Sequence, residues 1–144
     1  MHLHLFAAIA WIGGSIFMFV LGVSLRDKKQ QQEVYPHIGP IFGYFELVSL
    51  IILMITGFFL ILENGLIYSI FETDSSDLTV FLRTKLLIVL FVIIATIIHF
   101  YIALKTNTTK RTPLQNTLSR STSMFIFIAN LFILHYAIMI RSIL

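Results

Sequence analysis

The sequence contains no cysteine, which excludes disulfide bonds, metal sites built on thiolates, iron–sulfur clusters and covalently attached c-type haem. It also has few charges. Asp, Glu, Lys and Arg make up 12% of its 144 residues, whereas soluble domains carry about one quarter. Ten basic and seven acidic residues are too few to cover a globule in water. The composition therefore excludes a soluble enzyme, a disordered chain and a nucleic-acid-binding protein.

Long apolar segments are what the sequence has instead. Hydrophobic residues make up 58% of the chain, and the mean hydropathy is +0.92. A helix needs about 20 apolar residues to cross the ~30 Å of hydrocarbon in a bilayer. Four segments meet that length: residues 3–25, 38–62, 78–104 and 121–144. We therefore expect residues 1–144 to form one domain, an all-α integral membrane four-helix bundle with up-down-up-down topology.

Local signals predict where some of these helices begin and end. Thr112 followed by Pro113 is typical of the start of a helix, because the hydroxyl caps it and proline fits its first position. Gly65 predicts the end of the regular part of the second helix. Residues 66–71 are then expected at the membrane interface, and residues 30–32 are interpreted as a polar loop.

The basic residues are distributed unevenly among the predicted loops. Seven lie in or beside the first and third loops: Arg26, Lys28, Lys29, Lys105, Lys110, Arg111 and Arg120. Three lie at the opposite ends of the spans: Arg83, Lys85 and Arg141. Loops rich in Lys and Arg stay in the cytoplasm. Both termini are therefore expected on the outer, periplasmic side.

Ionisable side chains within the spans need a specific reason, because they are costly in hydrocarbon. Helical phase and depth place them in two layers. The outer layer is predicted to hold His4, Lys85 and His135. The inner layer is predicted to hold Glu46 as a buried acidic partner of His99, with His37 at its edge. A Glu46–His99 pair with a purely structural role remains the alternative.

Three short motifs resemble known membrane families. Residues 4–17, HLFAAIAWIGGSIF, resemble the opening helix of the copper resistance protein D (CopD) family, in which a His precedes a Trp by seven residues and a Gly pair and a Phe follow. Thr56 and Gly57 are similar to the same family's second helix. Residues 81–87, FLRTKLL, are similar to the related HemJ-type protoporphyrinogen oxidases, in which a Lys opens the third helix.

The resemblance implies two chemistries in a bacterial inner membrane. HemJ-type proteins are haem-b-associated enzymes that oxidise protoporphyrinogen, and their His and Lys correspond to His4 and Lys85. The chain lacks their Phe-Tyr-Leu-Pro-Arg-type continuation after Trp11 and their Asn-Glu-Pro element near the fourth helix, which argues against that activity. CopD-type proteins are associated with the passage of copper across the inner membrane.

The leading hypothesis is a haem-b-binding membrane protein or electron-transfer module. Two neutral imidazoles can ligate haem iron, and His4 and His135 are the best-placed pair on neighbouring helices. Cations at the depth of the haem propionates and a face with small residues complete the predicted site: Arg83, Lys85, Arg141, Trp11 and Gly14. A second haem between His37 and His99 is a weaker hypothesis.

Two further hypotheses stay open. Copper transport is the first, because imidazole and thioether groups suit copper. Its predicted ligands are His2, His4, His135 and Met139, with Glu46 and His99 continuing the path inward. The second is an accessory subunit that packs against a redox partner, a larger membrane complex or another copy of itself, through a stripe of small residues at Gly39 and Gly43.

Overall fold

The computed structural model describes residues 1–73, 75–105 and 112–144. Within these ranges the chain is helical and has no strand. The helices are α1 (His2–Ser24), α2 (Lys28–Glu63), α3 (Ile67–Phe71), α4 (Asp77–Lys105) and α5 (Pro113–Ile143). The four longer helices have the length and apolar composition needed to cross a membrane. The predicted all-α class and the four membrane-length segments are thus confirmed. Lys110 and Arg111, used above for the orientation, lie outside the described residues.

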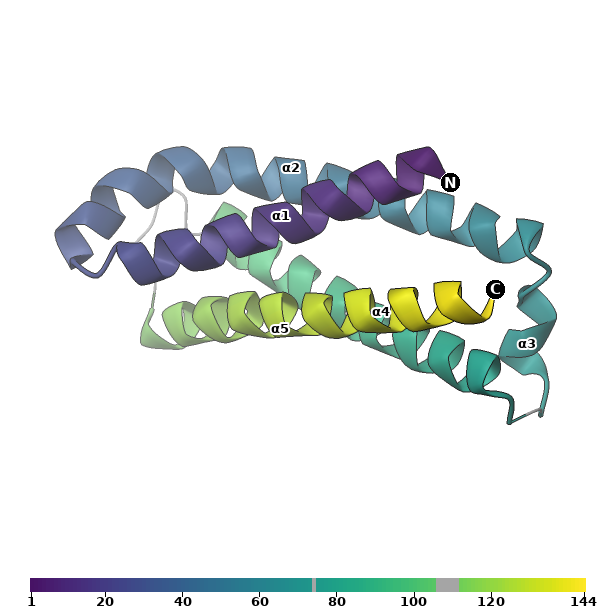
Figure 1. The fold of residues 1–144 in the computed structure, drawn as a ribbon. Coiled ribbons are helices and arrows are strands. Elements are labelled where there is room, and N and C mark those ends of the chain that lie inside the picture. Colours follow the sequence, from purple (N-terminus) through teal and green to yellow (C-terminus); the bar gives the residue numbers. More distant parts are fainter. Residues whose placement is uncertain (74, 106–111) are drawn as a thin grey trace.

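The long helices run side by side as an elongated bundle (Figure 1). α1 packs mainly against α2, and α4 mainly against α5, while smaller interfaces of α1 with α5 and of α2 with α4 join these pairs. At one such interface the rings of Phe19 and Phe127 stack with centroids 4.3 Å apart. Both termini lie at the same end as α3, here called the terminal end (Figure 1). The turn between α1 and α2 lies at the opposite end, here called the loop end.

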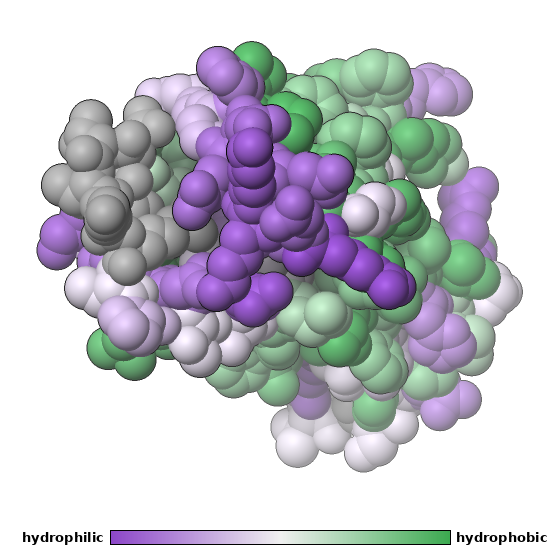
Figure 2. All heavy atoms as spheres, turned by 90° about the vertical axis from the view of Figure 1, so that its left-hand side faces the viewer, coloured by the Kyte–Doolittle hydropathy of each residue, from purple (hydrophilic) through white to green (hydrophobic). Residues whose placement is uncertain are grey.

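The bundle interior is narrow, and its surface is mostly apolar. The main core draws on all four long helices: Trp11, Leu50, Val92, Ala95, Ile126 and Ala129. Most other large apolar side chains are exposed, as contact with lipid tails requires. Figure 2 looks onto the loop end and shows hydrophilic side chains gathered there, where Arg26, Lys28 and Lys29 are exposed. Hydrophilic side chains therefore form a cluster at this end of the bundle.

Two helix boundaries follow the sequence signals. α5 begins at Pro113, and Thr112 and Gln115 form a reciprocal cap in which each side chain accepts the other's backbone N–H, at 3.2 and 3.1 Å. α2 ends at Glu63, and Gly65 follows with a φ of +65°, a conformation that glycine adopts without steric cost. Both predictions are confirmed.

The start of α2 differs from the prediction. The helix begins at Lys28, so the interpretation of residues 30–32 as a loop was wrong. Asp27 caps the helix by accepting the backbone N–H of Lys29 at 3.2 Å, and the Lys and Gln residues that follow are good helix formers. Pro36 and Pro40 lie inside the helix without breaking it. Hydropathy marks where a helix enters hydrocarbon, and it does not mark where the helix begins.

Candidate functional site: a polar cavity between the four long helices

Polar side chains are buried inside the membrane-length helices. The residues with at most 8% exposure are Ser15, Glu46, Ser49, Thr79, Thr96, Ser119 and Asn130. They come from all four long helices, and two of them, Ser15 and Glu46, line one cavity. Because buried polar groups in a bilayer need partners or a function, this cavity is the candidate functional site.

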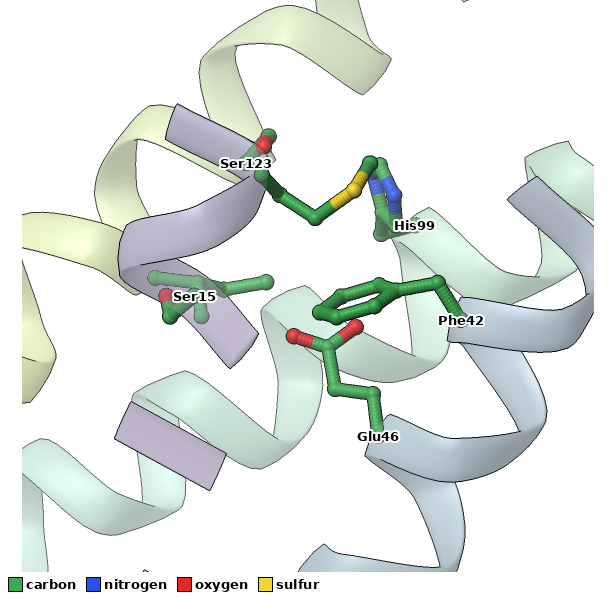
Figure 3. A pocket seen from close by; sticks show the side chains of 7 residues that line it. Ser15, Phe42, Glu46, His99 and Ser123 are labelled. Carbon is green, nitrogen blue, oxygen red and sulfur yellow. The ribbon is translucent and has the colours of Figure 1, made fainter. Parts of the chain in front are cut away.

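The cavity has a volume of about 20 Å³, which is room for one water molecule or one ion. Its lining comes from α1, α2, α4 and α5: Ser15, Met18, Phe42, Glu46, His99, Ser123 and Ile126. Figure 3 shows the labelled side chains around this shared space, with the Glu46 carboxyl group beside the ring of Phe42. A carboxyl group, an imidazole, a thioether and two hydroxyls therefore surround a volume of atomic size.

Glu46 has the strongest need for a ligand in this cavity. Its side chain is 8% exposed and carries the only carboxyl group among the buried side chains of the described ranges. In those ranges no hydrogen bond or ion pair of this carboxyl group is found. A carboxylate without a partner is costly in hydrocarbon. A cation bound in the cavity would balance its charge.

His99 reaches the cavity from α4, and its ring is held next to α5. Its Nδ1 lies 3.4 Å from the hydroxyl of Thr122, which also hydrogen-bonds to the backbone carbonyl of Leu118 at 2.8 Å. The structure therefore brings Glu46 and His99 to one cavity, as the inner-layer prediction expected. His37 does not join them, since it is exposed on α2.

Gly14 allows α1 and α2 to approach each other beside the cavity. A Cβ atom at this position would lie 2.9 Å from Cζ of Phe42, closer than carbon atoms approach. Gly14 was predicted to lie on the small-residue face of the haem site, next to the haem. The ring of Phe42 occupies the space next to Gly14 and forms one wall of the cavity.

Sequence reasoning missed two residues of this region. Met18, which lines the cavity, was not among the predicted site residues. Asn130 was not singled out, yet it is 2% exposed and its Oδ1 accepts the indole N–H of Trp11 at 2.8 Å. The sequence pattern that could have identified them is the spacing of three or four residues, or its multiples, which places side chains on one face of a helix. Met18 follows Trp11 and Ser15 in this way on α1, and Asn130 follows Ser119 and Ser123 on α5.

His4 lies in a second polar group, nearer the terminal end. Its Nδ1 is 2.8 Å from the hydroxyl of Thr56, which donates its own proton to the carbonyl of Ile52 at 2.6 Å. The Thr56 oxygen must therefore accept from His4, so Nδ1 carries the proton and Nε2 keeps its lone pair. A Cβ atom at Gly57 would lie 3.3 Å from Cε1 of His4. The ammonium of Lys85 is close enough to interact with this ring electrostatically.

His135 lies elsewhere. It is exposed on α5, in a surface depression formed with Ile128, Leu131 and Phe132 of the same helix. In the described part of the chain, no contact joins it to His4. Ligation of one haem by these two residues remains an untested prediction.

The remaining predicted ligands and cations are dispersed. His2 and Arg141 are exposed, and Met139 is partly buried on α5. Arg83 is exposed and donates hydrogen bonds to the carbonyls of Ile70, at 3.1 Å, and Glu72. Its guanidinium thereby fastens the carboxyl end of α3 to α4, where a cation is favourable.

The small-residue stripe on α2 is divided between two environments. A Cβ atom at Gly43 would lie 3.5 Å from the ring of Phe100 on α4, so Gly43 serves packing within the bundle. Gly39 has no atom within 4 Å of such a position.

The described residues contain no group of three His, Asp or Glu side chains that could hold a metal ion. A metal site in this region would therefore need a thioether or hydroxyl donor as well.

Comparisons of the chain with protein-family models, with curated proteins and with solved structures found no match.

Proposed function

We propose that this chain is an integral membrane protein that binds a copper ion in the cavity between its four long helices and carries it across the bilayer. One observation carries the proposal. Met18, Glu46 and His99, from three different helices, line a single cavity large enough for one ion. The motifs that resemble the CopD family support the same function.

The chemistry of the donors favours copper over other cations. Thioether and imidazole groups suit monovalent copper, whereas magnesium, calcium and manganese prefer oxygen donors alone. A monovalent copper ion beside the Glu46 carboxylate forms a neutral pair, which is the least costly arrangement for a charge in hydrocarbon. The cavity therefore fits copper by size, donor type and charge.

The proposed orientation follows the positive-inside rule. The exposed cations Arg26, Lys28 and Lys29 gather at the loop end, which we place in the cytoplasm of a bacterial cell. Both termini and α3 then lie on the periplasmic side, in an up-down-up-down arrangement. The cavity lies between these two ends, as a site of passage requires.

Anaerobic titration of the purified protein with Cu(I), against a chelator whose colour reports free copper, tests the binding. We expect one Cu(I) per chain, and we expect Met18→Leu and His99→Ala each to weaken binding about tenfold or more. Met54→Leu is the matched control, because Met54 is 46% exposed on α2. Failure to bind copper, or equal affinities for Met18→Leu and Met54→Leu, would contradict the proposal.

Haem b is a second candidate, supported by the geometry of His4. A ligating histidine commonly donates its other ring N–H to a fixed acceptor, as His4 does to Thr56. Absorption spectra of the oxidised and reduced protein test it. A Soret band that is lost in His4→Ala would favour haem, and a spectrum without such a band would reject it.

A further inference from the structure

Two buried hydrogen-bonding groups lie next to the cavity without a protein partner. They are the hydroxyl of Thr96 on α4 and the side-chain Nδ2 of Asn130 on α5. Both residues are 2% exposed, and within the described residues neither atom makes a hydrogen bond. Leaving such groups unsatisfied in the middle of a membrane bundle is costly.

The orientation of the Asn130 amide is fixed by Trp11. An indole N–H can only donate, so the Asn130 atom that faces it must be the carbonyl oxygen. The NH₂ group of Asn130 therefore points away from Trp11 with its protons unused. Thr96 and Asn130 thus offer donors to a small ligand that can accept hydrogen bonds.

Helix geometry places Thr96 and Asn130 each about one turn from a residue that lines the cavity. Thr96 comes three residues before His99, and Asn130 comes four residues after Ile126, and both His99 and Ile126 line the cavity. Three or four residues are one helical turn, or about 5 Å along the axis. α4 runs from the terminal end to the loop end, and α5 runs back (Figure 1). Thr96, which precedes His99, and Asn130, which follows Ile126, therefore both lie on the terminal side of the cavity.

We propose that Thr96 and Asn130 bind water one turn beyond the cavity, so that water reaches from the cavity to the middle of the bundle. The line of polar groups on α5 continues toward the loop end through Ser123 and the buried Ser119. From Ser119 to Asn130 it extends over about 16 Å, roughly half the hydrocarbon thickness. The main apolar core next to it includes Leu50 on α2 and Val92 on α4.

Magnetisation transfer from water to the side-chain N–H protons of Trp11 and Asn130 tests this site by NMR on the full chain in nanodiscs. Trp11 is the one tryptophan of the chain, so its indole signal needs no further assignment. We expect transfer to the Asn130 NH₂ protons in the wild type and its loss in Thr96→Val. Thr84→Val is the matched control, because Thr84 bonds the carbonyl of Val80 in its own helix. Thr96→Ser, which keeps the hydroxyl, should retain the transfer.

The change in unfolding temperature caused by Thr96→Val is an independent test, because its sign depends on whether Thr96 binds water. If Thr96 holds water, Thr96→Val removes a satisfied hydroxyl and lowers the unfolding temperature. If the site is dry, the same change removes an unsatisfied hydroxyl and raises it. A higher unfolding temperature, or the absence of water transfer in the wild type, would overturn the proposal. Neither measurement depends on copper, so the water site and the copper site can fail separately.

Discussion

Polar side chains have different surroundings in two regions of the bundle. In the cavity region, which comprises Ser15, Met18, Glu46, His99 and Ser123, side chains from four helices face one small volume. In the terminal region, which comprises His4, Thr56 and Arg83, the polar side chains are hydrogen-bonded to other parts of the protein. His4 bonds to Thr56, and Arg83 bonds to the carbonyls at the end of α3.

The contrast separates hydrogen-bonded groups that stabilise the fold from Glu46, to which a bound cation would supply a partner. A hydrogen-bonded pair such as His4 and Thr56 links α1 to α2 whether or not anything else binds. Glu46 has no such partner among the described residues, although it is the buried carboxyl group there. The stability of the terminal region should therefore respond to substitution, whereas ligand binding should respond most in the cavity region.

The largest expected effect comes from Glu46→Gln, which keeps the size of the side chain and removes its charge. A copper ion in the cavity would lose its counter-charge, so we expect Cu(I) affinity to fall about hundredfold, or about 3 kcal/mol. Glu63→Gln is the control, since Glu63 is exposed at the end of α2. Chelator competition measures both variants, and equal affinities would show that the two regions do not differ as described.

The next effect is on packing beside the cavity. Gly14→Ala would force Phe42 to move, so we expect the free energy of unfolding to fall by about 1–3 kcal/mol. At the neighbouring Gly13, a Cβ atom would meet no atom within 4 Å, so Gly13→Ala should be neutral or stabilising by about 0.5–1 kcal/mol. Unfolding in detergent with denaturant gives both values. Equal losses for the two variants would mean that Phe42 does not pack against α1 at Gly14.

In the terminal region, Thr56→Val should lower the free energy of unfolding by about 1 kcal/mol, because it removes the acceptor of the His4 N–H. Copper affinity should not change. Thr84→Val, which affects a bond within one helix, is the control for loss of a hydroxyl. If copper binding fell as much in Thr56→Val as in Met18→Leu, the site would extend to the terminal region.

The smallest effect is expected from Arg83→Gln. Loss of the bonds from its guanidinium to Ile70 and Glu72 should release α3 at a cost of about 0.5 kcal/mol. Hydrogen exchange of the backbone amides in residues 67–72 measures it. We expect faster exchange there, with no change in the middle of α4. Unchanged exchange in α3 would show that other contacts hold it.

Sequence reasoning located the helices well because apolar length and capping residues are local signals, as at Thr112 and Gly65. It also brought Glu46 and His99 to one layer, since helical phase and depth constrain both. It did not predict which face of α5 is buried. His135 and Asn130 are five residues apart, which is about 140° around a helix, and the choice between their two faces depends on which side meets α1 and α4. Only packing settles that choice, and it buries Asn130.

Ligation of copper by Met18 in the cavity is tested most directly by X-ray absorption at the copper edge of Cu(I)-loaded protein. We predict one sulfur neighbour together with nitrogen or oxygen neighbours, and loss of the sulfur neighbour in Met18→Leu with its retention in Met54→Leu. A copper environment without sulfur in the wild type, or one that Met18→Leu leaves unchanged, would contradict copper binding at this site.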